Sequence, residues 1–171
     1  MRCQRKLLFV FLLVSGVATG QTQTFTRDGV EFALELPSQQ WRAVSRLDVH
    51  DHVEFIYEGD AANGYLRLRK NMVDAGTLPE VLFQRDERQT LHSLPGYVVC
   101  GECIGEKFAG RLSGMTFNYE YSSGGQPMAG RLYYLQVDNR TIYTLHFTGA
   151  RDKLQALRDQ IDSMARTFRM K

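Results

Sequence analysis

The sequence predicts an α+β fold, an α/β/α sandwich in which a mainly antiparallel sheet is flanked by helices. Apolar residues recur at every second position in several segments up to Phe147, and at every third or fourth position after Arg151. The links between the later strand patterns are short, and short links imply antiparallel pairing. The chain contains no internal repeat, low-complexity tract or interdomain linker, so we expect residues 21–171 to form one domain.

Residues 1–20 have the layout of a cleavable signal peptide. Basic residues at positions 2–6 precede an apolar run over 7–14, and the small residues Ala18 and Gly20 suit the positions before a cut at Gln21. The apolar run is shorter than the roughly 20 residues of a membrane-spanning helix. We therefore expect an exported protein, periplasmic or extracellular, without stable membrane insertion after cleavage.

The charge of the mature chain is nearly balanced. The chain has 21 basic and 19 acidic residues, and three of the basic ones lie in the predicted signal peptide, which leaves 18 against 19 and a net charge of −1. The mature sequence has no run of like charges. This pattern argues against nucleic acid or an anionic membrane surface as the partner.

The first half of the mature chain is expected to hold three strands and a helix. Alternating apolar residues predict strands at 30–36, 53–57 and 65–68, and Asn63-Gly64 indicates a hairpin turn between the last two.

The helix begins with a capping-box pattern at residues 77–80, in which the threonine oxygen would accept a backbone amide and proline lies in the first turn. It is predicted to reach about Leu91. The polar segment 84–89 should lie on the surface, with Val81 and Leu82 facing the core together with Leu91.

The second half is predicted to be a strand meander followed by a helix. Alternation predicts strands at 115–121, 133–137 and 143–147, with turns at 124–127 and 138–139. Helical spacing from Arg151 onward places five apolar residues on one face: Leu154, Leu157, Ile161, Met164 and Phe168.

The order of these elements is similar to a known pattern. An early strand ends in Leu36-Pro37 with Trp41 shortly after, a surface helix lies mid-chain, and a meander ending at 140–147 precedes an amphipathic helix at 154–168. This order resembles the superfamily that includes the PsbP extrinsic proteins of photosystem II and the DcrB-like exported proteins of bacteria. The resemblance covers nearly all of the mature chain. It implies a sheet with helices on both faces and an accessory or binding role, and it brings no catalytic residue.

Cys100 and Cys103 form the local motif that most directly suggests a chemistry. Thiol–disulfide exchange usually places the first cysteine at a helix N-terminus, whereas the neighbouring Val99 and Ile104 favour strands. Glu102 would also disfavour a thiolate. We therefore predict a structural disulfide between Cys100 and Cys103. A disulfide that closes such a short loop would stabilise the folded domain by about 2 kcal/mol. A thiol–disulfide oxidoreductase is the alternative, and zinc would need two further ligands.

His50, His52 and Glu54 would share one face of a strand that begins early, and this spacing suits a divalent metal. The same pattern is typical of a solvated strand face, and no fourth ligand is identifiable. We therefore predict no metal and no cofactor, with metal binding as an alternative.

No residue is predicted to be catalytic. His146 should point away from the face that carries Tyr143, and His92 lies near the end of the polar helix. The sequence contains neither a Gly-x-Ser-x-Gly elbow nor a His-Glu-x-x-His motif. The numerous tyrosines of the meander would fill the core or form an adhesive aromatic surface.

These observations predict an exported, non-catalytic binding or accessory module with an unknown protein or small-molecule partner in the cell envelope. An enzyme, either the oxidoreductase or a hydrolase, and a divalent metal-binding protein are the alternatives.

Overall fold

The structure is a computed structural model that describes residues 22–44, 52–59, 62–99 and 105–171 of the chain. The predicted signal peptide lies outside these residues. No helix within the described ranges is both long and apolar enough to cross a bilayer.

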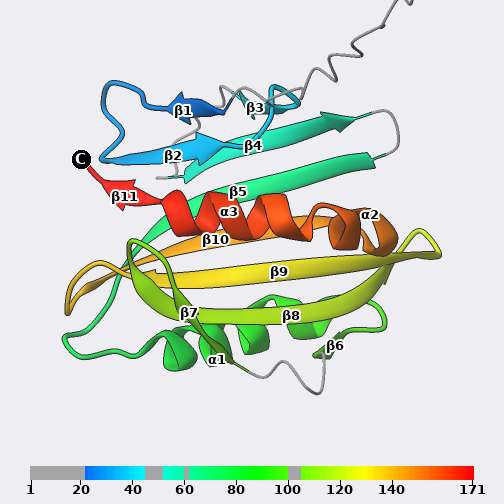
Figure 1. The fold of residues 1–171 in the computed structure, drawn as a ribbon. Coiled ribbons are helices and arrows are strands. Elements are labelled where there is room, and N and C mark those ends of the chain that lie inside the picture. The colour runs from blue at the N-terminus through cyan, green and yellow to red at the C-terminus, as the bar shows by residue number, and fades with distance from the viewer. Residues whose placement is uncertain (1–21, 45–51, 60–61, 100–104) are drawn as a thin grey trace, which may run out of the picture.

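The central element is an eight-stranded antiparallel sheet (Figure 1). Its strands are β3 (Trp41–Val44), β4 (His52–Gly59), β5 (Ala62–Met72), β6 (Val98–Val99), β7 (Glu106–Ala109), β8 (Ser113–Ser123), β9 (Gln126–Gln136) and β10 (Thr141–Ala150). The spatial order is β3-β4-β5-β10-β9-β8-β6, and β7 also pairs with β8. The predicted meander in the second half is therefore confirmed, because β8, β9 and β10 pair in sequence.

A second, three-stranded sheet joins the two ends of the described chain. It has the order β1-β2-β11, with β1 at Gln23–Phe25, β2 at Phe32–Leu36 and β11 at Arg169–Met170. The sequence pattern indicated β2 but neither of its partners.

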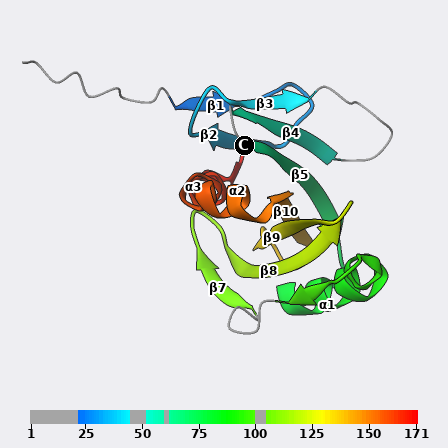
Figure 2. The ribbon, with the colours of Figure 1, turned by 90° about the vertical axis from the view of Figure 1, so that its right-hand side faces the viewer.

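The helices lie on opposite faces of the central sheet (Figure 2). They are α1 (Pro79–Gln89), the short 3-10 helix η1 (Leu91–Ser93), α2 (Arg151–Ala156) and α3 (Arg158–Thr167). Helices α2 and α3 and the small sheet cover one face, which we call the closed face. Helix α1 and η1 lie on the other, which we call the open face, beside β8 and β9 and away from β3 and β4.

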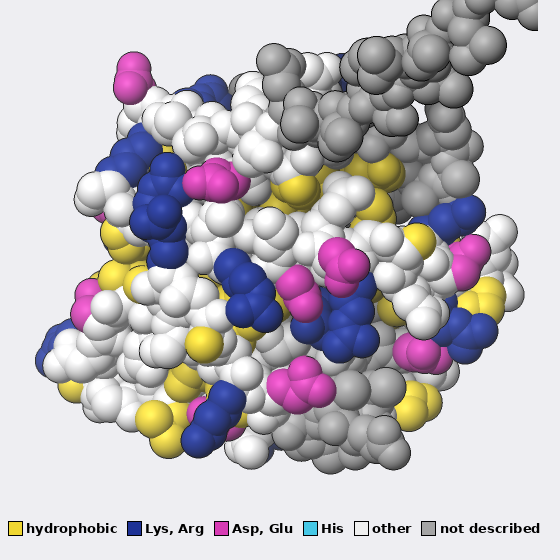
Figure 3. All heavy atoms as spheres, in the orientation of Figure 1, with side chains coloured by type: hydrophobic (Ala, Val, Ile, Leu, Met, Phe, Trp, Pro, Cys, Tyr) yellow, Lys and Arg dark blue, Asp and Glu magenta, His cyan; other side chains and the backbone are white. Residues whose placement is uncertain are grey.

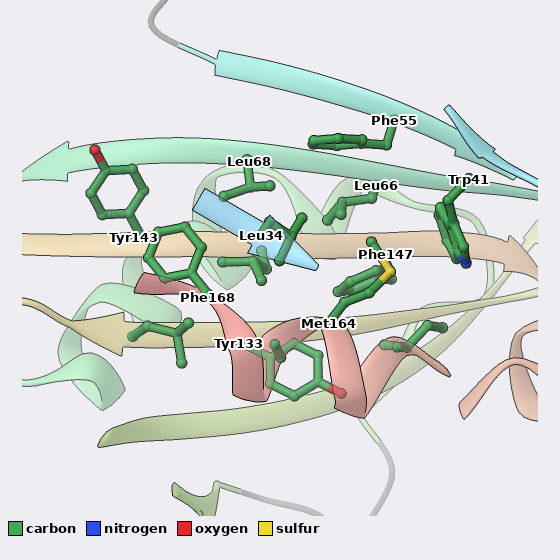
Figure 4. Close-up of a cluster of buried hydrophobic side chains, with 14 of the residues drawn as sticks. Leu34, Trp41, Phe55, Leu66, Leu68, Tyr133, Tyr143, Phe147, Met164 and Phe168 are labelled. Atoms are coloured by element: carbon green, nitrogen blue, oxygen red, sulfur yellow. The ribbon is translucent and has the colours of Figure 1, made fainter. Parts of the chain in front are cut away.

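The closed face carries the larger hydrophobic core (Figure 4). The ring of Phe25 from the small sheet packs on Phe55 at a centroid distance of 4.9 Å, and Phe32 packs on Tyr143 at 5.8 Å. Trp41 is fully buried here, as expected for a core residue. Burial of each large apolar side chain stabilises the fold by about 1.5–3 kcal/mol.

The open face has a smaller core beneath α1. Phe83 stacks on Phe117 of β8 at 3.8 Å between centroids, and Leu82 is buried with it. This core covers β8, β9 and part of β10. Helix α1 reaches β5 through the ion pair between Asp86 and Arg69, with 2.7 Å between the charged atoms.

The predicted helix at the C-terminus is confirmed on its inward face and differs at one point. All five apolar residues named from its spacing are buried. The helix is interrupted at Leu157, where α2 ends and α3 begins, and Phe168 follows the last turn of α3.

The predicted hairpin turn at Asn63-Gly64 is wrong. Asn63 and Gly64 lie inside β5, paired with Glu58 and Tyr57, and the two strands are linked by residues 60–61. A side chain at position 64 would bring its first carbon 3.2 Å from the Cβ of Tyr57. Gly64 thus permits close packing rather than a turn.

The capping box at residues 77–80 is also wrong. The hydroxyl of Thr77 donates to the backbone oxygen of Asp74 at 2.7 Å, and the N-cap is Leu78, which makes no side-chain cap bond. The preceding loop therefore takes the hydroxyl that would have capped the helix. Val81 is exposed instead of facing the core, because Leu82 and Phe83 form the inward side of α1.

Candidate functional site

Cys100, Cys103 and Glu102 lie outside the described residues, so the predicted disulfide stays a prediction. The flanking chain is extended on both sides, since β6 ends at Val99 and β7 begins at Glu106. Both strands pair with β8.

Only two of the three candidate metal ligands lie in the described part of the chain. His50 lies outside the described residues, while His52 and Glu54 lie on the open face of β4 with 3.2 Å between Nε2 and Oε1. The hydrogen bond from Tyr65, followed by the charge of Arg67, lowers the pKa of Glu54 despite its burial. Arg67 lies 3.4 Å from the same carboxylate. Within the described ranges, no three His, Cys, Asp or Glu side chains form a group that could hold a metal.

His146 lies on the open face and points away from the face that carries Tyr143, as the sequence predicts. Its Nε2 lies 2.7 Å from the hydroxyl of Tyr119. Burial, with the nearby charges of Arg67 and Arg69, lowers the pKa of His146 to about 4. Burial raises the pKa of Tyr119, so both groups are neutral near pH 7 and the phenol donates to the imidazole.

His92 lies at the surface, 3.6 Å from the carboxylate of Glu87. The meander tyrosines Tyr119, Tyr133, Tyr134 and Tyr143 are buried. Core filling is therefore the correct interpretation for these four of the five meander tyrosines, while Tyr121 is only partly buried.

The strongest candidate site is a cleft of about 540 Å³ where α2 and α3 cross the β8–β9 end of the closed face. Its floor comes from β8 and β9, at Asn118, Glu120, Ala129 and Arg131. These residues share one side of the sheet because Asn118 pairs with Arg131 and Glu120 pairs with Ala129. The wall is formed by Arg151, Asp152, Leu154, Gln155 and Arg158. Acidic and basic side chains are intermixed over this side of the molecule (Figure 3).

Arg131 is the buried cation at the floor of the cleft, with 7% of its surface exposed. Its Nε donates to Asp162 Oδ1 at 3.0 Å and to the hydroxyl of Tyr133 at 2.5 Å. Its Nη1 donates to the side-chain oxygen of Asn118 at 2.6 Å. Tyr133 also donates to Asp162. This network compensates the buried charge and fixes the guanidinium in one orientation.

Two further arginines stand at the mouth of the cleft. Arg151 pairs with Glu120 at 3.2 Å. Arg158, in the first turn of α3, is exposed, and its side chain makes no hydrogen bond or ion pair with any described residue. The side-chain oxygen of Asn118 is occupied by Arg131, so its amide hydrogens remain to donate.

The lining of the cleft therefore combines three arginines with two carboxylates, Glu120 and Asp152. Guanidinium groups bind carboxylates and phosphates through paired, charge-assisted hydrogen bonds. Asp162 is paired with Arg131, and Glu120 is paired with Arg151. Asp152 lies 4.0 Å from Lys153, so Arg158 is the arginine of the lining that has no carboxylate partner among the described residues. A ligand with an anionic group is the class that these residues suit.

This site was not predicted from the sequence. Its signal was present, since Arg131 is a charged residue at an inward position of a strand whose next inward residues are Tyr133 and Leu135. A charged residue in such a position is rarely buried without a dedicated partner. That partner, Asp162, lies 31 positions further along the chain, on α3.

Comparison with known proteins identifies the fold. Cyanobacterial PsbP (CyanoP) from Synechocystis sp. PCC 6803 matches with a TM-score of 0.59 and 13% identity, over 91% of this chain and 96% of that one. LpqN of Mycobacterium tuberculosis, described as involved in cell envelope biogenesis, matches with a TM-score of 0.53 and 16% identity, over 88% and 91%. A Bacteroides thetaiotaomicron VPI-5482 protein matches with a TM-score of 0.58 and 12% identity.

The match to the Bacteroides protein includes 90% of this chain, but it spans only about half, 49%, of the Bacteroides protein. No protein-family model and no curated protein sequence matches the chain. At these identities the likeness concerns the fold alone. The protein is an α+β protein with a mainly antiparallel sheet. More particularly, it has a PsbP-like fold, as the resemblance in its sequence implied.

Proposed function

We propose that this chain is an exported, non-catalytic binding module of the cell envelope, and that the cleft between α2–α3 and β8–β9 holds an anionic group of its ligand. The signal-peptide pattern at residues 1–20 supports export. Similarity in fold to PsbP and to LpqN, the latter an envelope biogenesis protein, supports an accessory role.

The single observation that carries the proposal is the arrangement of arginines in the cleft. Arg131 is held in place by Asp162, Tyr133 and Asn118, so it loses little conformational freedom when a ligand binds. Arg158 is exposed beside it without a partner among the described residues. Together they offer one fixed and one adjustable cation to the same anionic group.

The proposal of a non-catalytic role is supported by the state of His146. His146 lies on the opposite face of the sheet from the cleft, its pKa is about 4, and its lone pair accepts from Tyr119. A group with this pKa is a weak base near neutral pH.

The proposed site is tested by titrating the processed chain with inorganic phosphate and with succinate, observed by NMR at arginine Nε–H and amide signals. We expect saturable shifts at Arg131, Gln155 and Arg158, and at least tenfold weaker binding in Arg158→Ala. Arg111→Ala is the matched control, because Arg111 is also exposed and its side chain has no partner among the described residues. Equal binding by the two variants, or no saturable shift with either anion, would contradict the proposal.

Export has its own test. N-terminal sequencing of the protein recovered from the envelope or the medium should find a chain that begins within two residues of Gln21. A chain that retains residues 1–20 would remove the exported location from the proposal.

The oxidoreductase alternative is separated by alkylating the exported protein before and after reduction. A fully oxidised pair at Cys100 and Cys103 that reacts only after reduction supports the structural disulfide. A thiolate that reacts rapidly in the native protein would favour the enzyme.

A further inference from the structure

A second hollow, of about 550 Å³, lies on the other side of the sheet, between α1, the end of β5 and the turn before β10. We call it the α1 groove and define it by Met72, Val81, Arg85, Arg88 and Arg140, all of which line it. It shares no residue with the cleft.

Large apolar side chains are exposed together at this groove. Met72 is 68% exposed and Val81 is 53% exposed, and Leu78, which follows the lining residue Thr77 in the chain, is 57% exposed. These are three of the four exposed large hydrophobic residues in the described ranges, and the fourth is Val98, at 61%. Single exposed apolar residues are common, but a group at one hollow indicates a contact surface. The fold does not need them, because Leu82 and Phe83 already form the buried side of α1.

Positive charge lies beside this apolar surface. Val81, Arg85 and Arg88 are separated by four and three positions, so they follow one side of α1. Arg140 faces them across the hollow. Asp74 is the one carboxylate among the described lining residues, so the groove has an excess of positive charge.

The arginines of the groove keep donors for a partner. Arg85 approaches Asp86 at 3.4 Å, while Asp86 makes a closer contact of 2.7 Å with Arg69. Arg88 donates through Nε to the backbone oxygen of Gln84, which leaves the two terminal nitrogens of its guanidinium.

We propose that the α1 groove docks an acidic segment of a partner protein, with carboxylates on Arg85, Arg88 and Arg140 and an apolar side chain against Met72 and Val81. Charge complementarity selects an acidic partner, because the groove is basic while the mature chain as a whole is slightly acidic. A hollow between a helix and a strand end suits a protruding chain segment, whereas a bilayer offers a flat surface that would touch the rim alone.

The test places the photoreactive residue benzoylphenylalanine at position 81 in cells that make the protein, with position 98 as the matched exposed control. We expect the adduct at position 81 to be at least fivefold enriched over that at 98. Mass spectrometry of the adduct should identify a protein segment that contains acidic and apolar residues. The double variant R85E/R88E should abolish the adduct at position 81. Circular dichroism should confirm that these surface changes leave the fold intact.

The recovered segment is then synthesised and titrated against the processed chain by fluorescence anisotropy. R85E/R88E should bind it at least tenfold more weakly than the unaltered protein, and Arg111→Ala, at an exposed arginine outside both sites, should bind it equally well. A main adduct with phospholipid, with a second copy of this chain or with a segment that lacks acidic residues would overturn the proposal. So would the absence of enrichment at position 81, or an unchanged affinity in R85E/R88E.

The two proposals fail independently. Loss of the anion-induced shifts in the cleft would leave the crosslink at the α1 groove unaffected, because the two hollows share no lining residue. The helices that line them, α2–α3 and α1, lie on opposite faces of the sheet (Figure 2).

Discussion

The two faces of the central sheet are built from the same strands, yet they carry different chemistry. On β5, Leu66 and Leu68 face the closed side and are buried among aromatic rings. Arg67 and Arg69, between and after them, face the open side and take part in ion pairs. The difference follows from what lies above each face. The small sheet, α2 and α3 exclude water from the closed face, so the strands beneath them carry apolar residues. On the open face α1 covers β8 and β9, so β4 and β5, which it does not cover, carry charged residues.

Among the described residues, each face also holds one buried charged side chain, and the two are accommodated in the same way. Arg131 on the closed face is 7% exposed and bound to Asp162. Glu54 on the open face is 8% exposed and lies against Arg67 and His52. In both cases an opposite charge from another helix or strand compensates the cost of removing the charged side chain from water: Asp162 of α3 for Arg131, and Arg67 of β5 for Glu54.

The largest expected effect compares adjacent residues of β4 that face opposite sides. Phe55→Ala should lower the free energy of unfolding by about 4 kcal/mol, because Phe55 is fully buried on the closed face. Ile56→Ala should lower it by less than about 2 kcal/mol, because part of its side chain remains in water. Urea denaturation measures both. Equal losses would contradict the division into a closed and an open face.

Removing the partner of the buried arginine should have the next largest effect. Asp162→Ala leaves the guanidinium of Arg131 uncompensated at the floor of the cleft, and should lower the free energy of unfolding by about 3 kcal/mol. The control is Asp162→Ala combined with Arg131→Met, which removes the stranded charge. If the double variant is no more stable than the single one, Asp162 acts through something other than this ion pair.

On the open face, His146 should make stability depend on pH between 6.5 and about 4. Its pKa is about 4 in the folded chain and near 6.5 when unfolded. Between these values the unfolded chain binds more protons, so the free energy of unfolding falls with falling pH, by up to about 3 kcal/mol in all. Denaturation curves of His146→Gln should lack this slope. The same slope in both proteins would show that other groups cause it.

The smallest effect is expected at the α1 groove. Val81→Asn should change the free energy of unfolding by no more than about 0.5 kcal/mol, because the side chain is mostly in water. A thermal melt measures it, with Leu82→Asn as the destabilising neighbour, since Leu82 is buried in the open-face core. A large loss from Val81→Asn would mean that this residue serves the fold and not a partner.

Much of the fold was predictable because its signals are local. Alternation in β8, β9 and β10 and helical spacing from Arg151 both arise from residues within a few positions of one another. The capping box and the hairpin turn failed for the opposite reason. The hydroxyl of Thr77 is taken by the preceding loop, and Gly64 is required where Tyr57 packs closely from β4.

The sequence by itself determined which positions of each strand and helix are apolar, and hence the α+β class and the PsbP-like order of elements. Only the tertiary structure decided where charges meet: Arg131 with Asp162 beneath the cleft, and Arg85 with Arg140 around the α1 groove. The physical reason is that side-chain periodicity is a property of neighbouring residues, whereas the compensation of a buried charge and the lining of a hollow depend on which distant elements the packed sheet brings together.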